Sequence, residues 1–306
     1  MRALNTSLSG VRMDSPLVLA SGVLGVTASS LRRVALAGAG AVTAKSCSLE
    51  PRQGHPAPCI LPFDHGMLNA VGLSNPGVSE TAKEVASYKQ RCATPIIASV
   101  FAGSVEQFGE VTAGIATARP DLIEVNVSCP NVESEFGLPF GADFEATGKI
   151  TRIVKEHAAG IPIAMKLTAQ CPSLARMAQV CQDNGADAIC AINTVGPGML
   201  IDTEVARPIL SNLMGGVSGG AIFPIALRAV WQIYRAVSIP IIGTGGVSTV
   251  DQVVQMLMAG ATAVGIGSAV YQQGIHLFAL LNQGLEDYLG ERHLTGSGDL
   301  MGRAHG

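Results

Sequence analysis

The chain has 306 residues, of which 48% are hydrophobic and 14% are charged, and its formal net charge is -3. The length accommodates one large α/β barrel or two average domains, and the composition supplies enough apolar material for a core. Because so few charges cannot build an extended basic surface, we expect neither a nucleic-acid partner nor attraction to an anionic membrane.

Apolar runs alternate with amphipathic segments along the chain. Residues 4–16 contain Ser9-Gly10 between two short alternating segments and predict a hairpin or cap. Eight apolar runs follow, at 16–22, 41–46, 95–101, 122–128, 162–168, 188–194, 240–246 and 263–269. Helical periodicity lies between them, at 29–38, 105–119, 144–159, 174–184, 225–237 and 249–259. Eight strands, most followed by a helix, predict a single (β/α)8 TIM barrel over residues 1–306.

Two long segments and the end of the chain depart from this alternation. Residues 47–76 contain five prolines, and residues 195–220 contain six glycines. Long loops in a compact barrel usually cover the catalytic mouth, so both are predicted to lie over the C-terminal ends of the strands. The glycine-rich residues 294–306 predict a loosely ordered tail. The first residues show no secretion or transit signal, so a soluble, cytoplasmic protein is expected.

Polar side chains gather at the ends of the predicted strands, where a barrel carries its functional groups. They include Ser21, Lys45, Ser46, Ser99, Asn126, Lys166, Asn193 and Thr194. Lys45 and Lys166 stand inside apolar runs, and a buried ammonium needs a partner. Both are therefore expected to face an anion in the mouth: a carboxylate, a phosphate or a flavin that becomes anionic on reduction. The alternative is that either lysine points outward between helices.

Glycine-rich turns follow the seventh and eighth predicted strands, at 243–246 and 265–268. Barrels commonly hold a phosphate there on backbone N–H groups, and a Cβ would keep the phosphate away from the backbone. Glycine also makes ordinary tight turns, but its presence at both positions favours a ligand that ends in a phosphate.

The segment NVSCPN at 126–131 is the candidate catalytic segment. Asn126, Ser128, Cys129 and Asn131 can each donate or accept hydrogen bonds or protons. Cys129 follows a strand end among polar residues, where a thiol can serve as general base or nucleophile. The other six cysteines lack metal-binding spacing and are interpreted as buried thiols, which argues against zinc or an iron–sulfur cluster held by this chain alone. The six histidines receive no role.

Six motifs and one lysine together resemble the class 1 dihydroorotate dehydrogenases, in order and in spacing. They are GMLNAVGLSNPG (66–77), NVSCPN (126–131), Lys166, INT (192–194), GGVSGGAI (215–222), IIGTGGV (241–247) and VGIGSA (264–269). The first motif and the overall length are more similar to the class 1B catalytic subunit than to the fumarate-using class 1A.

The resemblance implies an FMN-containing barrel that oxidises (S)-dihydroorotate to orotate in de novo pyrimidine (UMP) biosynthesis. Cys129 would take the proton from C5 while hydride leaves C6 for the flavin N5. The substrate would contact Lys45, Asn69, Ala70, Val71, Gly72, Leu73, Asn126, Asn131, Asn193 and Thr194. FMN would lie against Ala20, Ser21, Lys45, Ser46, Ser99, Asn126, Lys166 and Ile192, with its phosphate on Gly219, Gly245, Gly246, Gly267 and Ser268.

The resemblance also implies partners. Class 1B catalytic subunits work with a second subunit that carries FAD and a [2Fe–2S] cluster and passes electrons to NAD, which would give a heterotetramer. The low charge and high apolar content predict a homodimer of this chain. No motif names the electron acceptor, which leaves NAD, fumarate and quinone open.

Four positions depart from the pattern of the family and bear on its substrate contacts. Ser99 stands where Asn is usual, Gln170 near an expected Ser/Thr-Pro-Asn, Phe223 where Lys is common, and Cys59 where Arg is usual. Three alternatives stay open. They are a related flavin barrel acting on a dihydropyrimidine such as dihydrouracil, a lyase that uses Lys166 as a Schiff-base amine, and an inactive barrel that serves as a scaffold.

Overall fold

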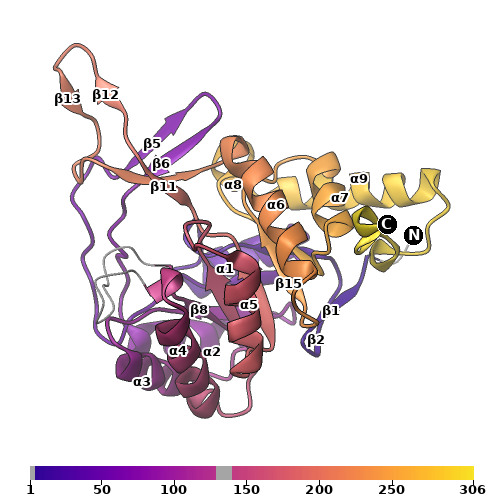
Figure 1. The fold of residues 1–306 in the computed structure, drawn as a ribbon, viewed down its shortest axis with the longest axis horizontal. Coiled ribbons are helices and arrows are strands. Elements are labelled where there is room, and N and C mark those ends of the chain that lie inside the picture. The colour runs from indigo at the N-terminus through magenta and orange to yellow at the C-terminus, as the bar shows by residue number, and fades with distance from the viewer. Residues whose placement is uncertain (1–3, 129–139) are drawn as a thin grey trace.

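The structure is a computed structural model that describes residues 4–128 and 140–306. Eight parallel strands close into a barrel in the order β10-β15-β16-β3-β4-β7-β8-β9 (Figure 1). They are β3 (Leu17–Leu19), β4 (Ala41–Thr43), β7 (Ile96–Val100), β8 (Leu122–Asn126), β9 (Ile163–Leu167), β10 (Ala188–Ala191), β15 (Ile241–Thr244) and β16 (Ala263–Ile266). Each of the eight predicted runs contains one of these strands, so the predicted TIM barrel is confirmed.

Helices follow the strands and cover the outside of the barrel (Figure 1). They are α1 (Ala28–Leu36), α2 (Val78–Lys89), α3 (Val105–Ala116), α4 (Phe144–His157), α5 (Leu174–Asp183), α6 (Phe223–Tyr234), α7 (Val250–Met258), α8 (Ala269–Gln273) and α9 (Leu277–Glu291). In the described part of the chain, none of them has the length and apolar character that a membrane span needs.

Side chains fix where several of these helices begin. Thr27, Ser104, Asp143, Ser173 and Thr249 each accept a hydrogen bond from a backbone N–H in the first turn. Such caps satisfy N–H groups that have no partner inside the helix. Each of these caps therefore fixes the point at which a loop from a barrel strand ends and the next helix begins.

The N-terminal hairpin closes the barrel at the end opposite to the mouth. Strands β1 (Thr6–Leu8) and β2 (Val11–Met13) pair antiparallel, as predicted. Leu8 and Met13 join one buried cluster with inward-facing strand residues that include Ala41, Ala164, Ala188 and Ala263. Because these alanines are small, they leave space inside the barrel that the two hairpin side chains fill.

The two long segments pair with each other in a sheet over the mouth. Strands β5 (Ile60–Phe63) and β6 (Gly66–Asn69) come from the first segment, and β11 (Val195–Gly198) and β14 (Gly215–Ser218) come from the second. They form a four-stranded sheet in the order β11-β14-β6-β5, here called the roof sheet. Between β11 and β14, the hairpin of β12 (Ile201–Asp202) and β13 (Arg207–Pro208) projects away from the barrel (Figure 1).

Glycine permits the close approach of these segments. Gly216 lies opposite Asn69 in the β14–β6 pair, and a Cβ at Gly216 would stand 2.2 Å from Thr194 Oγ1. The side chain of any other residue would therefore push the roof sheet away from the end of β10. The predicted position over the mouth is correct, whereas the pairing into a regular sheet was not predicted.

The end of the chain is packed rather than loose. Residues 294–306 contain the 3₁₀ helices η3 (Ser297–Leu300) and η4 (Arg303–His305). Leu300 is fully buried, and the His305 ring stacks on Trp231 with ring centroids 5.1 Å apart. The loosely ordered tail predicted from its glycines is therefore corrected, because one aliphatic and one aromatic contact hold these residues against the helices.

We predict that Leu8→Ala lowers the free energy of unfolding by about 2–5 kcal/mol, because it empties part of the barrel interior. Leu8 is 1% exposed, whereas Leu36 on α1 is 69% exposed and supplies the matched control. Leu36→Ala should change the same quantity by less than about 0.5 kcal/mol. Urea denaturation followed by circular dichroism measures both, and equal losses would contradict the proposed packing of the hairpin.

Candidate active site

A cavity of about 510 Å³ opens at the C-terminal ends of the barrel strands. This size is typical of sites for small molecules and cofactors. Residues at or just past the ends of seven barrel strands line it: Ala20, Ser21, Lys45, Ser46, Asn126, Lys166, Ile192, Asn193, Thr194, Gly245, Gly246, Gly267 and Ser268. The structure thus brings together most of the polar strand-end residues that the sequence singled out, and both lysines face this cavity.

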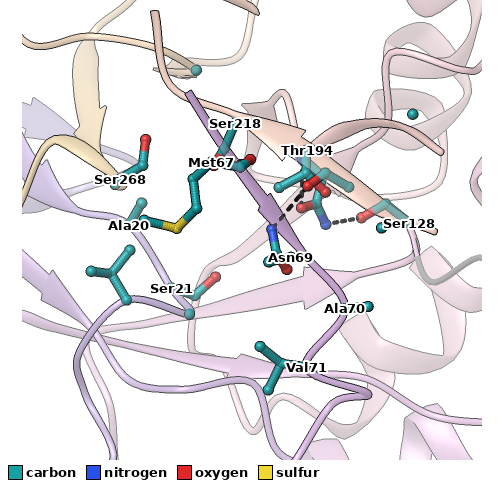
Figure 2. Close-up of a pocket in the computed structure, with 18 of the residues that line it drawn as sticks. Ala20, Ser21, Met67, Asn69, Ala70, Val71, Ser128, Thr194, Ser218 and Ser268 are labelled. Carbon is teal, nitrogen blue, oxygen red and sulfur yellow. Dashed lines mark hydrogen bonds between the residues drawn. The ribbon is translucent and has the colours of Figure 1, made fainter. Parts of the chain in front are cut away.

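The roof sheet supplies the opposite wall. Asn69, at the end of β6, and the next four residues, 70–73, line the cavity as predicted. Asn69 Nδ2 donates to the Gly216 carbonyl oxygen at 3.2 Å, which ties the side chain to β14. Figure 2 shows Met67 and Asn69 on β6 with Ala20 and Ser21 of the barrel beside them. The ligand space is therefore enclosed between the barrel mouth and the roof sheet.

Three side chains from β8 and the loop after β10 orient one another. Asn193 Nδ2 donates to Asn126 Oδ1 at 3.2 Å and also to Ser128 Oγ. Ser128 Oγ in turn donates to Asn126 Oδ1 at 2.6 Å. Because each amide oxygen and nitrogen is assigned by these bonds, the group presents a fixed set of donors and acceptors. Such a set suits a planar ring that carries both carbonyl and N–H groups.

Lys166 pairs with a buried carboxylate, Glu124, that the sequence analysis missed. Lys166 Nζ stands 3.4 Å from Glu124 Oε1, and the two side chains are 6% and 4% exposed. Glu124 lies within the run 122–128, which the sequence analysis treated as apolar. The signal was the two-residue period of the strand, which places Glu124 on the same face of β8 as Asn126. The carboxylate of Glu124 therefore supplies one anion that Lys166 needs.

The glycines after β15 and β16 fit a phosphate group. Gly245 and Gly246 have φ of 136° and 75°, in the region that favours glycine, and a Cβ at Gly246 would stand 2.6 Å from the Gly219 carbonyl oxygen. At Gly267, by contrast, a Cβ would meet nothing nearer than Ala20 Cβ at 3.8 Å. Packing within the protein does not require glycine there, so the open space in front of Gly267 fits a group held close to the backbone.

Two predicted cofactor contacts, Ser99 and Gly219, do not line the cavity in the described part of the chain. Ser99 is fully buried, and its hydroxyl lies 2.8 Å from Ser46 Oγ. The Gly219 carbonyl oxygen lies against Gly246. Cys129 and Asn131 fall outside the described residues, although Ser128, which precedes Cys129, lines the cavity.

Two further residues line the cavity, although neither was predicted to contact a ligand. His55, to which no role was given, lines the cavity, and its Nδ1 lies 3.0 Å from the Ala70 carbonyl oxygen. Gln170 also lines it and donates to the Gly196 carbonyl oxygen. Both contacts join segments far apart in the sequence, so neither could be found from local periodicity.

The buried cysteines are poor candidates for a base. Burial raises the pKa of Cys47, Cys181 and Cys190 to about 12. These thiols therefore stay protonated at neutral pH. The interpretation of buried thiols is correct for these three and for Cys171, whereas Cys59 and Cys92 are only partly buried. Within residues 4–128 and 140–306, no group of three or more histidine, cysteine, aspartate or glutamate side chains is placed to hold a metal.

Comparisons with known proteins cover nearly the whole chain. The family model described as dihydroorotate dehydrogenase matches residues 3–289. The protein named dihydroorotate dehydrogenase B (NAD(+)), catalytic subunit, of Methanothermobacter thermautotrophicus is 41% identical over 302 residues, covering 99% of this chain and 98% of that protein. Proteins of the same name from Methanosarcina mazei and Geobacter sp. are 40% and 37% identical over 300 residues each, covering 98% of this chain and 94% and 97% of theirs.

We predict that Gly267→Ala leaves the fold intact but weakens binding of the FMN expected here. The new methyl group has room in the protein and stands in the space that a phosphate would use. Titration of the apoprotein should show FMN affinity lowered by about tenfold or more, equivalent to about 1.4 kcal/mol.

Gly260→Ala is the matched control for glycine replacement. Gly260 has φ of 109°, and its Cβ would stand 2.2 Å from Tyr234 Cγ. That variant should lose thermal stability, whereas Gly267→Ala should not. Unchanged FMN affinity in Gly267→Ala would contradict the placement of the phosphate.

Proposed function

Since the chain belongs to the dihydroorotate dehydrogenase family, we propose that it is the catalytic subunit of a class 1B enzyme, which oxidises (S)-dihydroorotate to orotate in de novo pyrimidine (UMP) biosynthesis. The resemblance in its motifs is confirmed by the family match over residues 3–289 and by relatives near 40% identity. The observation that carries the proposal is that one cavity is lined by the amides of Asn126 and Asn193, by Lys45, and by the glycine turns after β15 and β16.

The substrate is bound by side chains at the barrel mouth and on the roof sheet. Dihydroorotate has a carboxylate and a ring with carbonyl and N–H groups. Lys45 supplies a positive charge for the carboxylate, and Asn69, Asn126 and Asn193 supply amides for the ring. Hydrogen bonds within the protein already hold these three amides, so little conformational entropy is lost on binding.

FMN is the cofactor that the same cavity would hold. Ala20, Ser21 and Lys166 would lie along its ring, and the glycines at 245, 246 and 267 would approach its phosphate. When bound, FMN supplies an acceptor for the hydride that leaves C6 of the substrate. The Lys166 ammonium would stabilise negative charge that develops on the ring.

Cys129 is the proposed general base. Its sulfur would take the proton from C5 while the hydride departs from C6 toward FMN. A double bond would then form between these two carbons. Ser128, the preceding residue, lines the cavity, and three buried cysteines elsewhere hold their protons too tightly for this role. A base with a lower pKa at the mouth is what the reaction needs.

A partner subunit completes the proposed enzyme. The relatives are named catalytic subunits of an NAD(+) enzyme, which implies a second subunit in those proteins. For this chain we propose a partner that carries FAD and a [2Fe–2S] cluster, joined to a homodimer in a heterotetramer. The homodimer and the cytoplasmic location stay predictions of the sequence, and a monomeric mass in light scattering would contradict the first.

Two alternatives are less well supported by the site. A Schiff-base lyase needs a neutral lysine amine, but Lys166 lies against the buried Glu124 carboxylate, which favours the ammonium. An inactive scaffold would have no use for a cavity with so many oriented polar groups. The third alternative is a flavin barrel acting on dihydrouracil. Because dihydrouracil differs from dihydroorotate only in lacking the carboxylate, comparing the two substrates tests this alternative directly.

We predict that the purified protein is yellow and loses its visible flavin absorbance when dihydroorotate is added without oxygen. Dihydrouracil should bleach it at least about 100-fold more slowly, because Lys45 then has no carboxylate to bind. Anaerobic stopped-flow absorbance measures both rates. Faster reduction by dihydrouracil would favour the alternative enzyme, and a protein that cannot be reconstituted with FMN would overturn the proposal.

We predict that Cys129→Ala binds FMN normally and reduces it about 100-fold to 10,000-fold more slowly with dihydroorotate, since the proton at C5 has lost its acceptor. Cys92→Ala, just after α2, is the matched control and should keep the wild-type rate. Single-turnover kinetics on both variants tests the assignment, and a Cys129→Ala enzyme as fast as the control would refute it.

A further inference from the structure

Glu124 is a buried acid that the proposed function does not use. It lies in the middle of β8, with Leu122 of the apolar barrel interior on one side and Asn126 of the cavity on the other. Moving a carboxylate out of water costs several kcal/mol even after relaxation. Neighbouring groups must therefore offset the desolvation cost of the Glu124 carboxylate, and the identity of these groups indicates its role.

Three donors converge on one oxygen of this carboxylate. Ser21 Oγ donates to Glu124 Oε1 at 2.9 Å, Ser99 Oγ donates at 2.8 Å, and Lys166 Nζ stands 3.4 Å away. Since the Ser99 proton is used in this bond, Ser46 Oγ is the donor in the 2.8 Å contact between the two serines. Ser46 thus donates to Ser99, and Ser21, Ser99 and Lys166 donate to Glu124, which is the arrangement of an ionised carboxylate.

Ser21 connects the two charges. Its Oγ accepts a hydrogen bond from Lys166 Nζ at 2.7 Å, and its hydroxyl donates a hydrogen bond to Glu124 Oε1. Glu124 thus holds the ammonium both directly and through the Ser21 hydroxyl. Ser21 and Lys166 both line the cavity, whereas Glu124 lies beneath them. The carboxylate can therefore act on a ligand in the cavity only through its field and through the position of Lys166.

We propose that Glu124 is a positioning residue that holds the Lys166 ammonium against the flavin and, through its negative charge, lowers the reduction potential of the bound FMN. This inference rests on the proposed function, because it requires FMN in the cavity. With Glu124 ionised, the pair carries no net charge, so Lys166 stabilises a reduced anionic ring less than an isolated ammonium would. The charge of Glu124, which does not itself line the cavity, therefore helps to set the reduction potential of the bound FMN.

Other charged and titratable groups near the pair do not replace Glu124. Cys190 on β10 faces the same interior, but burial raises its pKa to about 12 and keeps it neutral. Lys45, past the end of β4, lines the cavity and adds positive charge. Ser99 from β7 and Ser21 past the end of β3 are neutral. Among residues 4–128 and 140–306, Glu124 is accordingly the carboxylate that pairs with Lys166.

The test is the midpoint potential of FMN in the reconstituted holoenzyme, measured by dye-equilibrated reduction between about pH 6 and about pH 9. Glu124→Gln should shift the potential upward at low pH, because the negative charge that opposes the Lys166 ammonium is then removed. Without its carboxylate the buried Lys166 also loses its proton more easily, so the upward shift should shrink as the pH rises. Ser99→Ala removes one bond to the same oxygen without changing charge and should leave the potential nearly unchanged.

An unchanged potential in a Glu124→Gln protein that binds FMN would overturn the proposal, as would equal shifts in Glu124→Gln and Ser99→Ala. If Glu124→Gln does not fold, the double variant Glu124→Gln/Lys166→Met leaves no unpaired buried charge and is compared with Lys166→Met. The proposal requires a higher potential in the double variant than in Lys166→Met at about pH 9, because the negative charge of Glu124 is then missing. Equal potentials in these two variants would overturn it.

Failure of the proposed function would be seen separately. The dye titration reduces FMN without dihydroorotate, so it reports on Glu124 even if dihydroorotate does not bleach the wild-type protein. Loss of substrate reduction together with the expected shift in Glu124→Gln would reject the substrate and keep the positioning role.

Discussion

The buried pair of Lys166 and Glu124 marks the level at which the barrel changes from an apolar core to a functional cavity. Two charges can remain there only because serine hydroxyls and their mutual attraction offset the loss of hydration. Below them, alanines and the side chains of the hairpin fill the barrel, so water does not reach the pair from that end. The packing of the hairpin therefore helps to keep the charged pair buried.

Above the pair, the cavity depends on how closely the roof sheet approaches the strand ends. Gly216 allows β14 to pass beside Thr194, and Asn69 is tied to that strand through its amide. The two longest departures from the barrel repeat therefore form one wall between them. Because ligand contacts come from both the mouth and this wall, the orientation of the roof sheet fixes the distance across the binding space.

Much of this architecture could be predicted from the sequence, because apolar runs with polar ends are direct consequences of buried parallel strands. Lys45, Asn126, Lys166 and Asn193 were found in this way. Glu124 was missed because it was counted within an apolar run, although the alternation of side chains along β8 places it on the same face as Asn126. The roof sheet was missed because its strands are rich in glycine and proline, and their pairing is set by partners some 150 positions away, as Asn69 and Gly216 are.

Ser99 shows how a residue singled out from the resemblance takes a different place in the structure. The resemblance implied a cofactor contact for Ser99, but its hydroxyl donates to Glu124 and contacts Ser46, and it does not line the cavity in the described part of the chain. Because Ser99 supports the carboxylate that pairs with Lys166, it can affect a ligand in the cavity only through that charged pair.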